Sequence, residues 1–325
     1  MRKRRKHFAN TIVFAAVLFT AIAPVRFAPP LMAQTKAPST AIDPKILALA
    51  KAGDTKSQLF VGYAYYAGEG TTSDLIEAAA WYRKAAENGD ATAQFTVGLA
   101  NIYDLFGTED HTQADIWLRK SAGHANLIDL HEVPAILIIL DNPYAQLGVL
   151  YEDGKDLPQD YSQAAFWFRR GAEQGDKGSQ NLLGALYFDG KGVSQDYAQA
   201  AAWFRKAAVQ GDMEAQSNIG GLYLVGRGVP QDYREAEKWL SKAADQGNAT
   251  ALYNLGTMYA KGQGVQQNNT GAYLCFDLAA ARQTGPDQAD AEKARDLAAS
   301  LLTPEDLSKA QQAAEKWFAA HPARW

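Results

Sequence analysis

The chain has 325 residues, of which 47% are apolar and 21% are charged. This composition excludes a disordered polar chain, and the length allows a sizeable core. The first 33 residues carry six Lys and Arg and no acid, so the remainder has 26 basic against 36 acidic residues, a net charge of −10. An acidic remainder argues against nucleic acid and against anionic lipid as the main ligand.

The first 33 residues are predicted to be a secretory signal peptide. A basic start, Arg2 to Lys6, precedes a mostly apolar stretch over residues 8–23, which is short for a membrane-spanning helix. The sequence Leu-Met-Ala before position 34 favours cleavage after Ala33. The alternative is an uncleaved membrane anchor. With cleavage, we expect a periplasmic or secreted protein of the Gram-negative envelope, with no stable membrane span.

A segment centred on Trp recurs along the chain. The copy around Trp203, Ala-Ala-Ala-Trp-Phe-Arg-Lys-Ala-Ala, has relatives around four other tryptophans and around Cys275. Successive copies are 36 residues apart, except for one step of 50 that contains an insertion of 14 residues. A fixed period of this size is typical of solenoids, in which each repeat is one supersecondary unit. The tryptophans at the centres of these copies are Trp81, Trp117, Trp167, Trp203 and Trp239.

Each repeat is predicted to contain two helices, which we name helix A and helix B. In the repeat 211–246, Gly211 ends the preceding helix and Asp212 caps helix A. Helix A carries a Gly in its middle, Gly220 in this repeat, and all six copies keep it. A Gly inside a helix costs about 1 kcal/mol relative to Ala, so its recurrence predicts that another helix crosses there at close range.

A Gly-rich turn, Gly226-Arg-Gly228, leads to helix B. It lacks the Lys-Ser/Thr of a phosphate-binding loop and no strand precedes it, so we interpret it as a helix–helix turn. Helix B begins with a capping box, Asp232-Tyr-Arg-Glu235, and its acids are interpreted as caps rather than as catalytic groups. The Trp and the Ala pair of helix B are expected on its buried face. The Lys/Arg pair after the Trp is expected in solvent.

The complete repeat runs Ala-x-x-x-Leu-Gly-x-x-Tyr, then Gly-x-Gly-Val-x-x-Asp, then Ala-x-x-Trp-Phe-x-Lys-Ala-Ala-x-x-Gly-Asp. This pattern resembles the Sel1-like repeat, a relative of the tetratricopeptide repeat, over about residues 53–282. The resemblance implies an all-α fold, a right-handed α-solenoid of antiparallel helix pairs with helix A mostly on the concave side. It also implies a binding scaffold, because members of the family are usually adaptors and regulators.

The sequence predicts a tether, an N-terminal cap, six repeats and a C-terminal cap, in this order. Residues 34–42 are expected to form a flexible tether, residues 43–52 an N-terminal capping helix, and residues 283–325 C-terminal capping helices. Such caps cover the open ends of a solenoid core. The six repeats are predicted at 53–88, 89–124, 125–174, 175–210, 211–246 and 247–282.

The third repeat contains an apolar insertion over residues 127–143, bracketed by Pro134 and Pro143. Two interpretations stay open for it. It is either an extra turn of helix packed under a neighbour, or an apolar surface for a partner. The irregular region 101–143 is where we expect any bend in the superhelix.

No constellation of residues in the sequence predicts catalysis. The single cysteine, Cys275, occupies a Trp position of the repeat, and a buried thiol is usually inert. No Ser has a Lys three residues later, so a serine β-lactamase mechanism has no nucleophile. The five histidines include no metal-binding pair one helical turn apart, so we predict neither a metal nor another cofactor. We therefore expect a protein that is not an enzyme.

Helix A residues that are not needed for packing are expected to line a partner-binding groove. One set, the inner column, is Phe60, Thr96, Gln146, Leu182, Asn218 and Asn254, and the neighbouring column is Tyr63, Leu99, Val149, Ala185, Gly221 and Thr257. From these columns the predicted binding residues are Tyr63, Thr96, Gln146, Asn218, Asn254 and Thr257. Asn218 and Asn254 stand out because stacked carboxamides can pair with the donors and acceptors of an extended backbone. The alternative is that they are merely solvated.

Two functions from different classes are compatible with the sequence. The first is an exported scaffold or adaptor, a monomer, that binds a protein or peptide partner of unknown identity on its concave helix-A face. The second is a cell-wall enzyme or a glycan-binding protein, because Tyr and Trp side chains can stack on sugars. The repeat core already accounts for the Trp series, so the first function is favoured.

Overall fold

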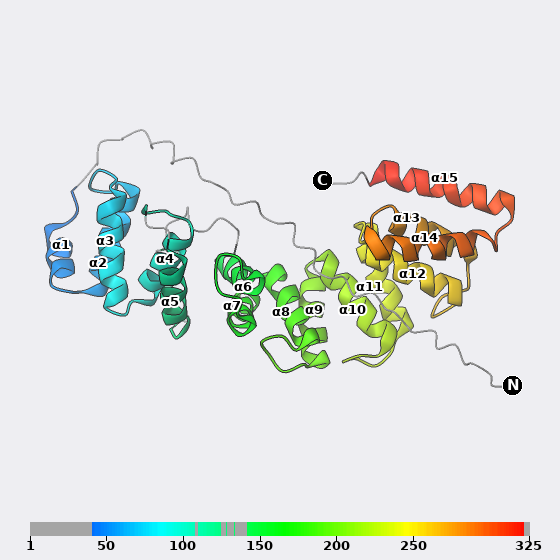
Figure 1. The fold of residues 1–325 in the computed structure, drawn as a ribbon, viewed down its shortest axis with the longest axis horizontal. Helices are drawn as coiled ribbons and strands as arrows, with labels where there is room; N and C mark the ends of the chain where they lie inside the picture. Colours follow the sequence, from blue (N-terminus) through cyan, green and yellow to red (C-terminus); the bar gives the residue numbers. More distant parts are fainter. Residues whose placement is uncertain (1–40, 108–109, 125–127, 129–132, 134–141, 322–325) are drawn as a thin grey trace. The chain divides into compact units, whose positions relative to one another are not determined.

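The computed structural model describes residues 41–107, 110–124, 128, 133 and 142–321. Within these residues all regular structure is α-helical, in fifteen helices, and there is no strand. The chain divides into two compact units, an N-terminal unit that ends at Gly171 and a C-terminal unit that begins at Ala172, and each is described by itself. The helices in Figure 1 are α1 (Pro44–Lys51), α2 (Thr55–Ala67), α3 (Leu75–Glu87), α4 (Ala91–Ile102), α5 (His111–Ala122), α6 (Pro143–Asp153), α7 (Tyr161–Glu173), α8 (Lys177–Asp189), α9 (Tyr197–Val209), α10 (Met213–Val225), α11 (Tyr233–Asp245), α12 (Ala249–Lys261), α13 (Asn269–Ala280), α14 (Gly285–Ala299) and α15 (Pro304–Ala320).

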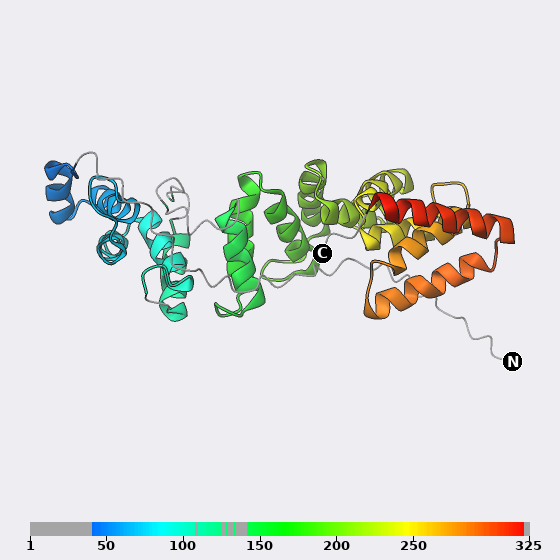
Figure 2. The same cartoon turned by 90° about the horizontal axis from the view of Figure 1, so that it is seen from above.

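Helices A and B alternate along the chain (Figures 1 and 2). In the N-terminal unit, α2 packs on α3 and α4 packs on α5, while α3 contacts α4 of the next repeat. In the C-terminal unit, the pairs are α8 with α9, α10 with α11, and α12 with α13, and α9 contacts α10 as α11 contacts α12. The predicted all-α solenoid of helix pairs is therefore confirmed.

The helices begin at the predicted capping residues. Asp212 and Asp232 are typical: the Asp212 carboxylate accepts the N–H of Ala215, and the Asp232 carboxylate accepts those of Arg234 and Glu235. One half of the predicted capping box is wrong, however. The N–H of Asp232 donates to the carbonyl of Tyr223 at 3.0 Å, because the turn folds back onto the end of α10, and so it does not bond the Glu235 side chain. Each side-chain cap contributes about 1 kcal/mol.

The Gly in the middle of helix A lies against a large side chain of helix B, as predicted. A Cβ atom at Gly148 would lie 2.3 Å from the ring of Phe168, and one at Gly220 would lie 2.7 Å from Cγ of Leu240. The same contact occurs in all six pairs, always with the residue that follows the Trp position of helix B. These pairs are Gly62–Tyr82, Gly98–Leu118, Gly148–Phe168, Gly184–Phe204, Gly220–Leu240 and Gly256–Phe276.

The Trp positions contribute to the core. Trp167 is fully buried, Trp81, Trp117 and Trp239 are at least nine-tenths buried, and Trp203 is half-buried. The Lys three residues after four of these tryptophans is exposed, as expected, but its ammonium also lies over the indole ring. The Nζ–centroid distances are 4.1 Å for Lys84, 4.3 Å for Lys120, 3.7 Å for Lys206 and 4.8 Å for Lys242. A cation over an aromatic face at an exposed site contributes about 0.5–1 kcal/mol.

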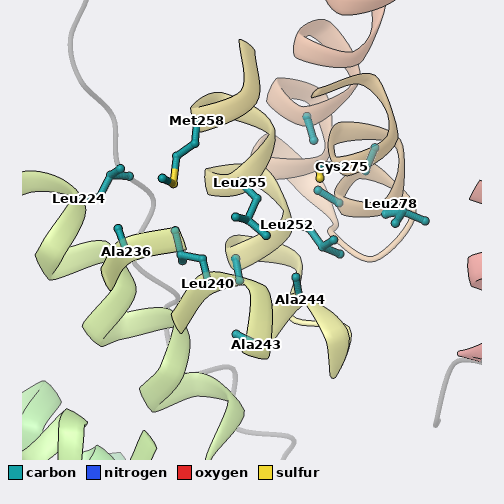
Figure 3. Close-up of a cluster of buried hydrophobic side chains, with 14 of the residues drawn as sticks. Leu224, Ala236, Leu240, Ala243, Ala244, Leu252, Leu255, Met258, Cys275 and Leu278 are labelled. Carbon is teal, nitrogen blue, oxygen red and sulfur yellow. The ribbon is translucent and has the colours of Figure 1, made fainter. Parts of the chain in front are cut away.

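Figure 3 shows the largest core cluster of the C-terminal unit, where side chains of α11, α12 and α13 meet. Leu240, Leu255 and Met258 interdigitate with small residues such as Ala243 and Ala279, and Cys275 takes the place that Trp has in other repeats. The small residues let the helix axes approach closely, which explains the Ala-rich sequence of helix B. Each buried Leu or Met side chain contributes about 1.5–3 kcal/mol.

A buried Gln in helix A connects successive repeats, and it was not predicted. Gln180 Nε2 donates to the carbonyl of Ala172 at 3.1 Å, and Gln180 Oε1 accepts from Gln210 at 2.8 Å. Gln216 does the same with Ala208 and Gln246 one repeat later. In the N-terminal unit the corresponding donors are Gln58, to Ala50, and Gln94, to Ala86. The carboxamides of Gln180 and Gln216 therefore each satisfy a carbonyl at the end of one helix B and a side chain at the end of the next.

The predicted signal peptide and nearly all of the tether lie outside the described residues, and so does most of the apolar insertion. Of the insertion, Ile128 and Val133 are described before Pro143, and both are buried. At the other end of the chain, α14 and α15 both pack on α13. No described helix combines the length and the apolar character that a membrane span requires.

Candidate partner-binding face

The predicted binding residues all lie on helix A elements. The N-terminal unit supplies Tyr63 on α2, Thr96 on α4 and Gln146 on α6, and the C-terminal unit supplies Asn218 on α10 with Asn254 and Thr257 on α12. Since α10 contacts α12, the structure brings the three residues of the C-terminal unit onto neighbouring helices.

The expectation that the inner column is free of packing is wrong for four of its six residues. Thr96 is 0% exposed, Gln146 9%, Asn218 5% and Asn254 3%. For Asn218 and Asn254 the reason is that helices A of adjacent repeats contact one another, α8 with α10 through Asn181 and α10 with α12. The other two residues are Leu182, which is half-buried, and Phe60, with 48% of its surface exposed. Tyr63 and Thr257 are half-buried.

Asn218 has a partner within the chain. Its Nδ2 donates to Oδ1 of Asn181 on α8 at 3.2 Å, which joins two successive helices A. A merely solvated Asn218 is therefore excluded. Thr257 also uses its hydroxyl locally, because Oγ1 donates to the carbonyl of Tyr253 at 3.1 Å.

The other polar residues of the inner column keep unused hydrogen-bonding groups. The Thr96 hydroxyl and Gln146 Oε1 are enclosed and have no hydrogen-bond partner among the described residues, although Gln146 Nε2 donates to the Tyr103 hydroxyl. The Asn254 carboxamide has no hydrogen bond to any described residue either, but it is not fully enclosed. Enclosed polar groups in proteins normally have partners, so Thr96 and Gln146 are unusual in this respect.

A charged network in the N-terminal unit was also missed by the sequence analysis. Arg119 bonds Asp115 at 2.8 Å and Asp160 at 2.9 Å, and the Tyr151 hydroxyl donates to Asp115 at 2.9 Å. Burial favours the protonated form of Asp160, but the N–H of Gln163 and the Arg119 guanidinium outweigh it, so the pKa of this carboxyl lies below its ordinary value. Burial and the Asp115 charge raise the pKa of Tyr151. The network fastens α5 to α6 and to the start of α7.

The lone thiol and the possible metal ligands of the described residues were compared with what a reactive site requires. Burial raises the pKa of Cys275 to about 12, so the thiol is protonated at neutral pH and a poor nucleophile. Across the described parts of the chain, no three His, Cys, Asp or Glu side chains come together in a way that could hold a metal ion. An open pocket beside the charged network is lined by His111, Thr112, Asp115, Gly154, Lys155, Asp156, Leu157 and Pro158.

Comparison with known proteins places these repeats in a family. The model of the Sel1 repeat matches residues 55–90, 144–176, 178–212, 214–248 and 249–283, which is more than half of the chain. The helix pair α4–α5 lies between the first two matches and is not matched itself. In this pair the sequence Asp104-Leu-Phe-Gly107 stands where most of the other pairs have a Gly-x-Gly turn.

Solved structures include similar chains. A Sel1 repeat protein from Oxalobacter formigenes is 31% identical over 71% of this chain and 89% of its own, with a TM-score of 0.43. The protein c5321, a protective antigen of uropathogenic Escherichia coli strains with an SLR fold, is 28% identical over 85% of this chain and 70% of its own, with a TM-score of 0.33. The comparison with curated proteins gave no match.

Sel1 repeat proteins generally mediate protein–protein interaction, and their fold is typically a non-catalytic scaffold. The repeat matches agree with the helix pairs, the helix-A glycines and the caps described above. On this evidence the chain belongs to the Sel1 repeat family.

Proposed function

We propose that this protein is an exported scaffold that binds a protein or peptide partner on its helix-A face. The observation that carries the proposal is the Asn254 carboxamide on α12, which has no hydrogen bond to any described residue and is not among the fully enclosed polar groups. A partner can pair with its two donors and its acceptor oxygen. The Thr96 hydroxyl and Gln146 Oε1 are enclosed and do not contribute to this contact.

An apolar anchor supports the same face. Phe60 is half-exposed on α2, and Tyr63 lies one turn further along the helix, where its ring is 6.3 Å from that of Tyr66. Aromatic side chains are enriched at the centres of protein–protein interfaces. The N-terminal unit therefore offers a partner an aromatic contact beside polar groups.

Export is part of the proposal and rests on the first 33 residues. Their basic start, apolar stretch and Leu-Met-Ala ending match the three parts of a signal peptide. Expression of the full chain in a Gram-negative host, followed by intact-mass analysis of the periplasmic fraction, tests this. We expect a chain that begins at Gln34. Full-length protein retained in the membrane fraction would instead establish an uncleaved anchor.

The alternative of a glycan-binding protein receives less support. A sugar platform needs an accessible aromatic face, but four of the five repeat tryptophans are at least nine-tenths buried, and Lys side chains cover three of these four indoles. The one thiol of the chain, Cys275, is buried and protonated and is therefore a poor nucleophile. We therefore propose a binding role without catalysis.

Photo-crosslinking in cells tests the proposed face. A photoreactive amino acid is placed at Phe60 or at Tyr63, on helix A, and at Ile76 as the control, because Ile76 is 80% exposed on helix B of the same repeat. We expect one dominant protein adduct from positions 60 and 63 and none from position 76. Adducts from position 76 alone would place the partner on the opposite face and contradict the proposal.

A further inference from the structure

The open pocket beside the charged network lies in the N-terminal unit, between the start of α5 and the turn that joins α6 to α7. Its volume is about 350 Å³. Pockets that hold small ligands measure about 300–1,000 Å³, so this one can accept a single side chain or a small molecule. It is lined from α5 by His111, Thr112 and Asp115, and from the turn by Gly154, Lys155, Asp156, Leu157 and Pro158.

The corresponding contact in the C-terminal unit is closed. Gly228, in the turn between α10 and α11, has the repeat position of Asp156, and Tyr197, at the start of α9, has that of His111. A Cβ atom at Gly228 would overlap the Tyr197 carbonyl, and the φ of Gly228 is +71°, so this position requires Gly. Asp156 does not share this conformation. The turn of the N-terminal unit therefore cannot close on α5 in the same way, and a pocket remains.

In the C-terminal unit the same turn supplies a cation to the helix below it. The Arg227 guanidinium lies over the Tyr197 ring, 5.0 Å from its centroid. Lys155 has the repeat position of Arg227, but its ammonium bonds Asp153 of its own turn at 2.9 Å. The turn of Arg227 has no carboxylate at the position of Asp153. Lys155 is therefore held away from the His111 ring, and a cation from outside the chain can take that place.

The charges around the pocket favour such a cation. Asp156 is exposed and has no hydrogen bond or ion pair with any described residue. Asp115 bonds Arg119 at 2.8 Å, and the same guanidinium bonds Asp160 at 2.9 Å, so one positive charge serves two carboxylates. Asp115 also keeps acceptor capacity, because a carboxylate offers about four lone-pair sites.

We propose that this pocket binds an arginine side chain of a protein partner. The guanidinium lies against the His111 ring, as that of Arg227 lies over Tyr197, and it donates to the carboxylates of Asp156 and Asp115. A guanidinium is planar and can stack on a ring while it bonds carboxylates, whereas an ammonium is a compact and more strongly hydrated charge. The pocket belongs to a helix B and a turn rather than to the helix-A face, so this inference goes beyond the proposed function.

Nuclear magnetic resonance of the full chain with two small probes tests the inference. The probes are acetyl-arginine amide and acetyl-citrulline amide, which has nearly the same shape but no charge. Carbon-13-labelled histidine reports binding through the ring signal of His111, which His111→Asn assigns by its disappearance. We expect the arginine probe to shift this signal saturably, with a Kd of about 1 mM. The citrulline probe should bind at least about tenfold more weakly, because it cannot form charge-assisted hydrogen bonds.

Substitutions of Asp156 separate the charge of the pocket from its shape. Asp156→Asn keeps the side-chain size and removes the charge, so it should weaken binding of the arginine probe about tenfold. Asp156→Gly restores the residue that closes the turn in the C-terminal unit, so it should abolish binding. The control is Asp245→Asn, which makes the same charge change at an exposed position of α11 and should leave the Kd unchanged. Thermal melts of the three variants confirm folding.

Two results would overturn the inference: no saturable shift of the His111 signal up to about 20 mM arginine probe, or equal affinity for the citrulline probe. Equal affinity for acetyl-lysine amide would reject guanidinium recognition and leave an unspecific acidic pocket. The crosslinks expected from Phe60 do not depend on this pocket, so its failure would leave the proposed helix-A face intact.

Discussion

Asn248 Nδ2 donates to Glu214 Oε1 at 3.0 Å, and this bond joins the first residues of α12 to the first turn of α10. Asn248 also caps α12 through its Oδ1, which accepts the N–H of Ala251 at 2.8 Å. Burial raises the pKa of Glu214, and the nearby Asp212 charge adds to this, although the Asn248 bond acts in the opposite direction. Ionised Glu214 therefore destabilises the folded protein at the contact between α10 and α12.

Replacing Glu214 by Gln should raise the melting temperature at pH 7. A carboxyl with a raised folded-state pKa stabilises the fold fully below its unfolded pKa, and that contribution is lost as pH rises through the folded pKa. Gln keeps the acceptor for Asn248 and has no charge to desolvate. The gain should therefore be largest near neutral pH and vanish below about pH 4, and melting curves from pH 3.5 to 8 measure it.

The exposed Glu315 on α15 provides the control, because Glu315→Gln should leave the melting temperature unchanged across this range. A melting temperature of Glu214→Gln that falls below that of the wild type at pH 7 would contradict the account.

The two glycines of α8 should respond to substitution in opposite ways. A Cβ at Gly184 would lie 2.8 Å from the Phe204 ring and 3.3 Å from the carbonyl of Ala200, so Gly184→Ala should destabilise the protein by about 1–3 kcal/mol. At Gly178 the nearest atom is an Asp176 oxygen at 3.5 Å, so Gly178→Ala should stabilise it by about 0.5–1 kcal/mol. Urea unfolding of both variants gives the signs, and the same sign for both would exclude a close crossing at Gly184.

The buried Gln of helix A should be required for repeat stacking. Gln216→Leu leaves the Ala208 carbonyl and the Gln246 side chain without their partner, which should cost about 1–3 kcal/mol. The equivalent position in α12 is already Leu252. Hydrogen exchange at the end of α9 and of α11 reports the loss locally, and unchanged exchange rates there would show that the bonds contribute nothing.

Removing the side-chain cap of one helix B should lower the stability of the protein less than Gln216→Leu does. Asp232→Ala deletes the acceptor for the N–H groups of Arg234 and Glu235 and should cost about 1 kcal/mol. Asp232→Asn keeps a side-chain oxygen acceptor and should cost little. A cost that is the same for both variants would mean that the charge of Asp232, rather than the cap, is what matters.

The sequence allowed the helices, their caps and their closest contacts to be predicted, because these follow from local rules repeated every 36 residues. The Asp before each helix and the Gly facing Phe168 or Leu240 are examples. Gln58 and Gln94, and likewise Gln180 and Gln216, are also 36 residues apart. Their bonds, however, join residues 8 and 30 positions apart, and spacing alone does not identify such partners.

The candidate site was predicted less well than the fold. The positions of Asn218 and Asn254 on helix A followed from the repeat, but their burial depends on how closely one helix A lies to the next. The pairing of Asn218 with Asn181 likewise depends on a contact between helices from different repeats. Asn218 and Asn254 occupy the same position of the repeat, but only Asn218 has a hydrogen-bond partner among the described residues. The difference became visible only in the three-dimensional packing.

Hydrogen–deuterium exchange in the presence of the protein captured through Phe60 tests the central claim most directly. Binding on the helix-A face predicts slower exchange in α2, α10 and α12, with no change in the outer helices α3, α9 and α11. Protection confined to α3, α9 and α11 would contradict the account, because the partner would then bind the helix-B face.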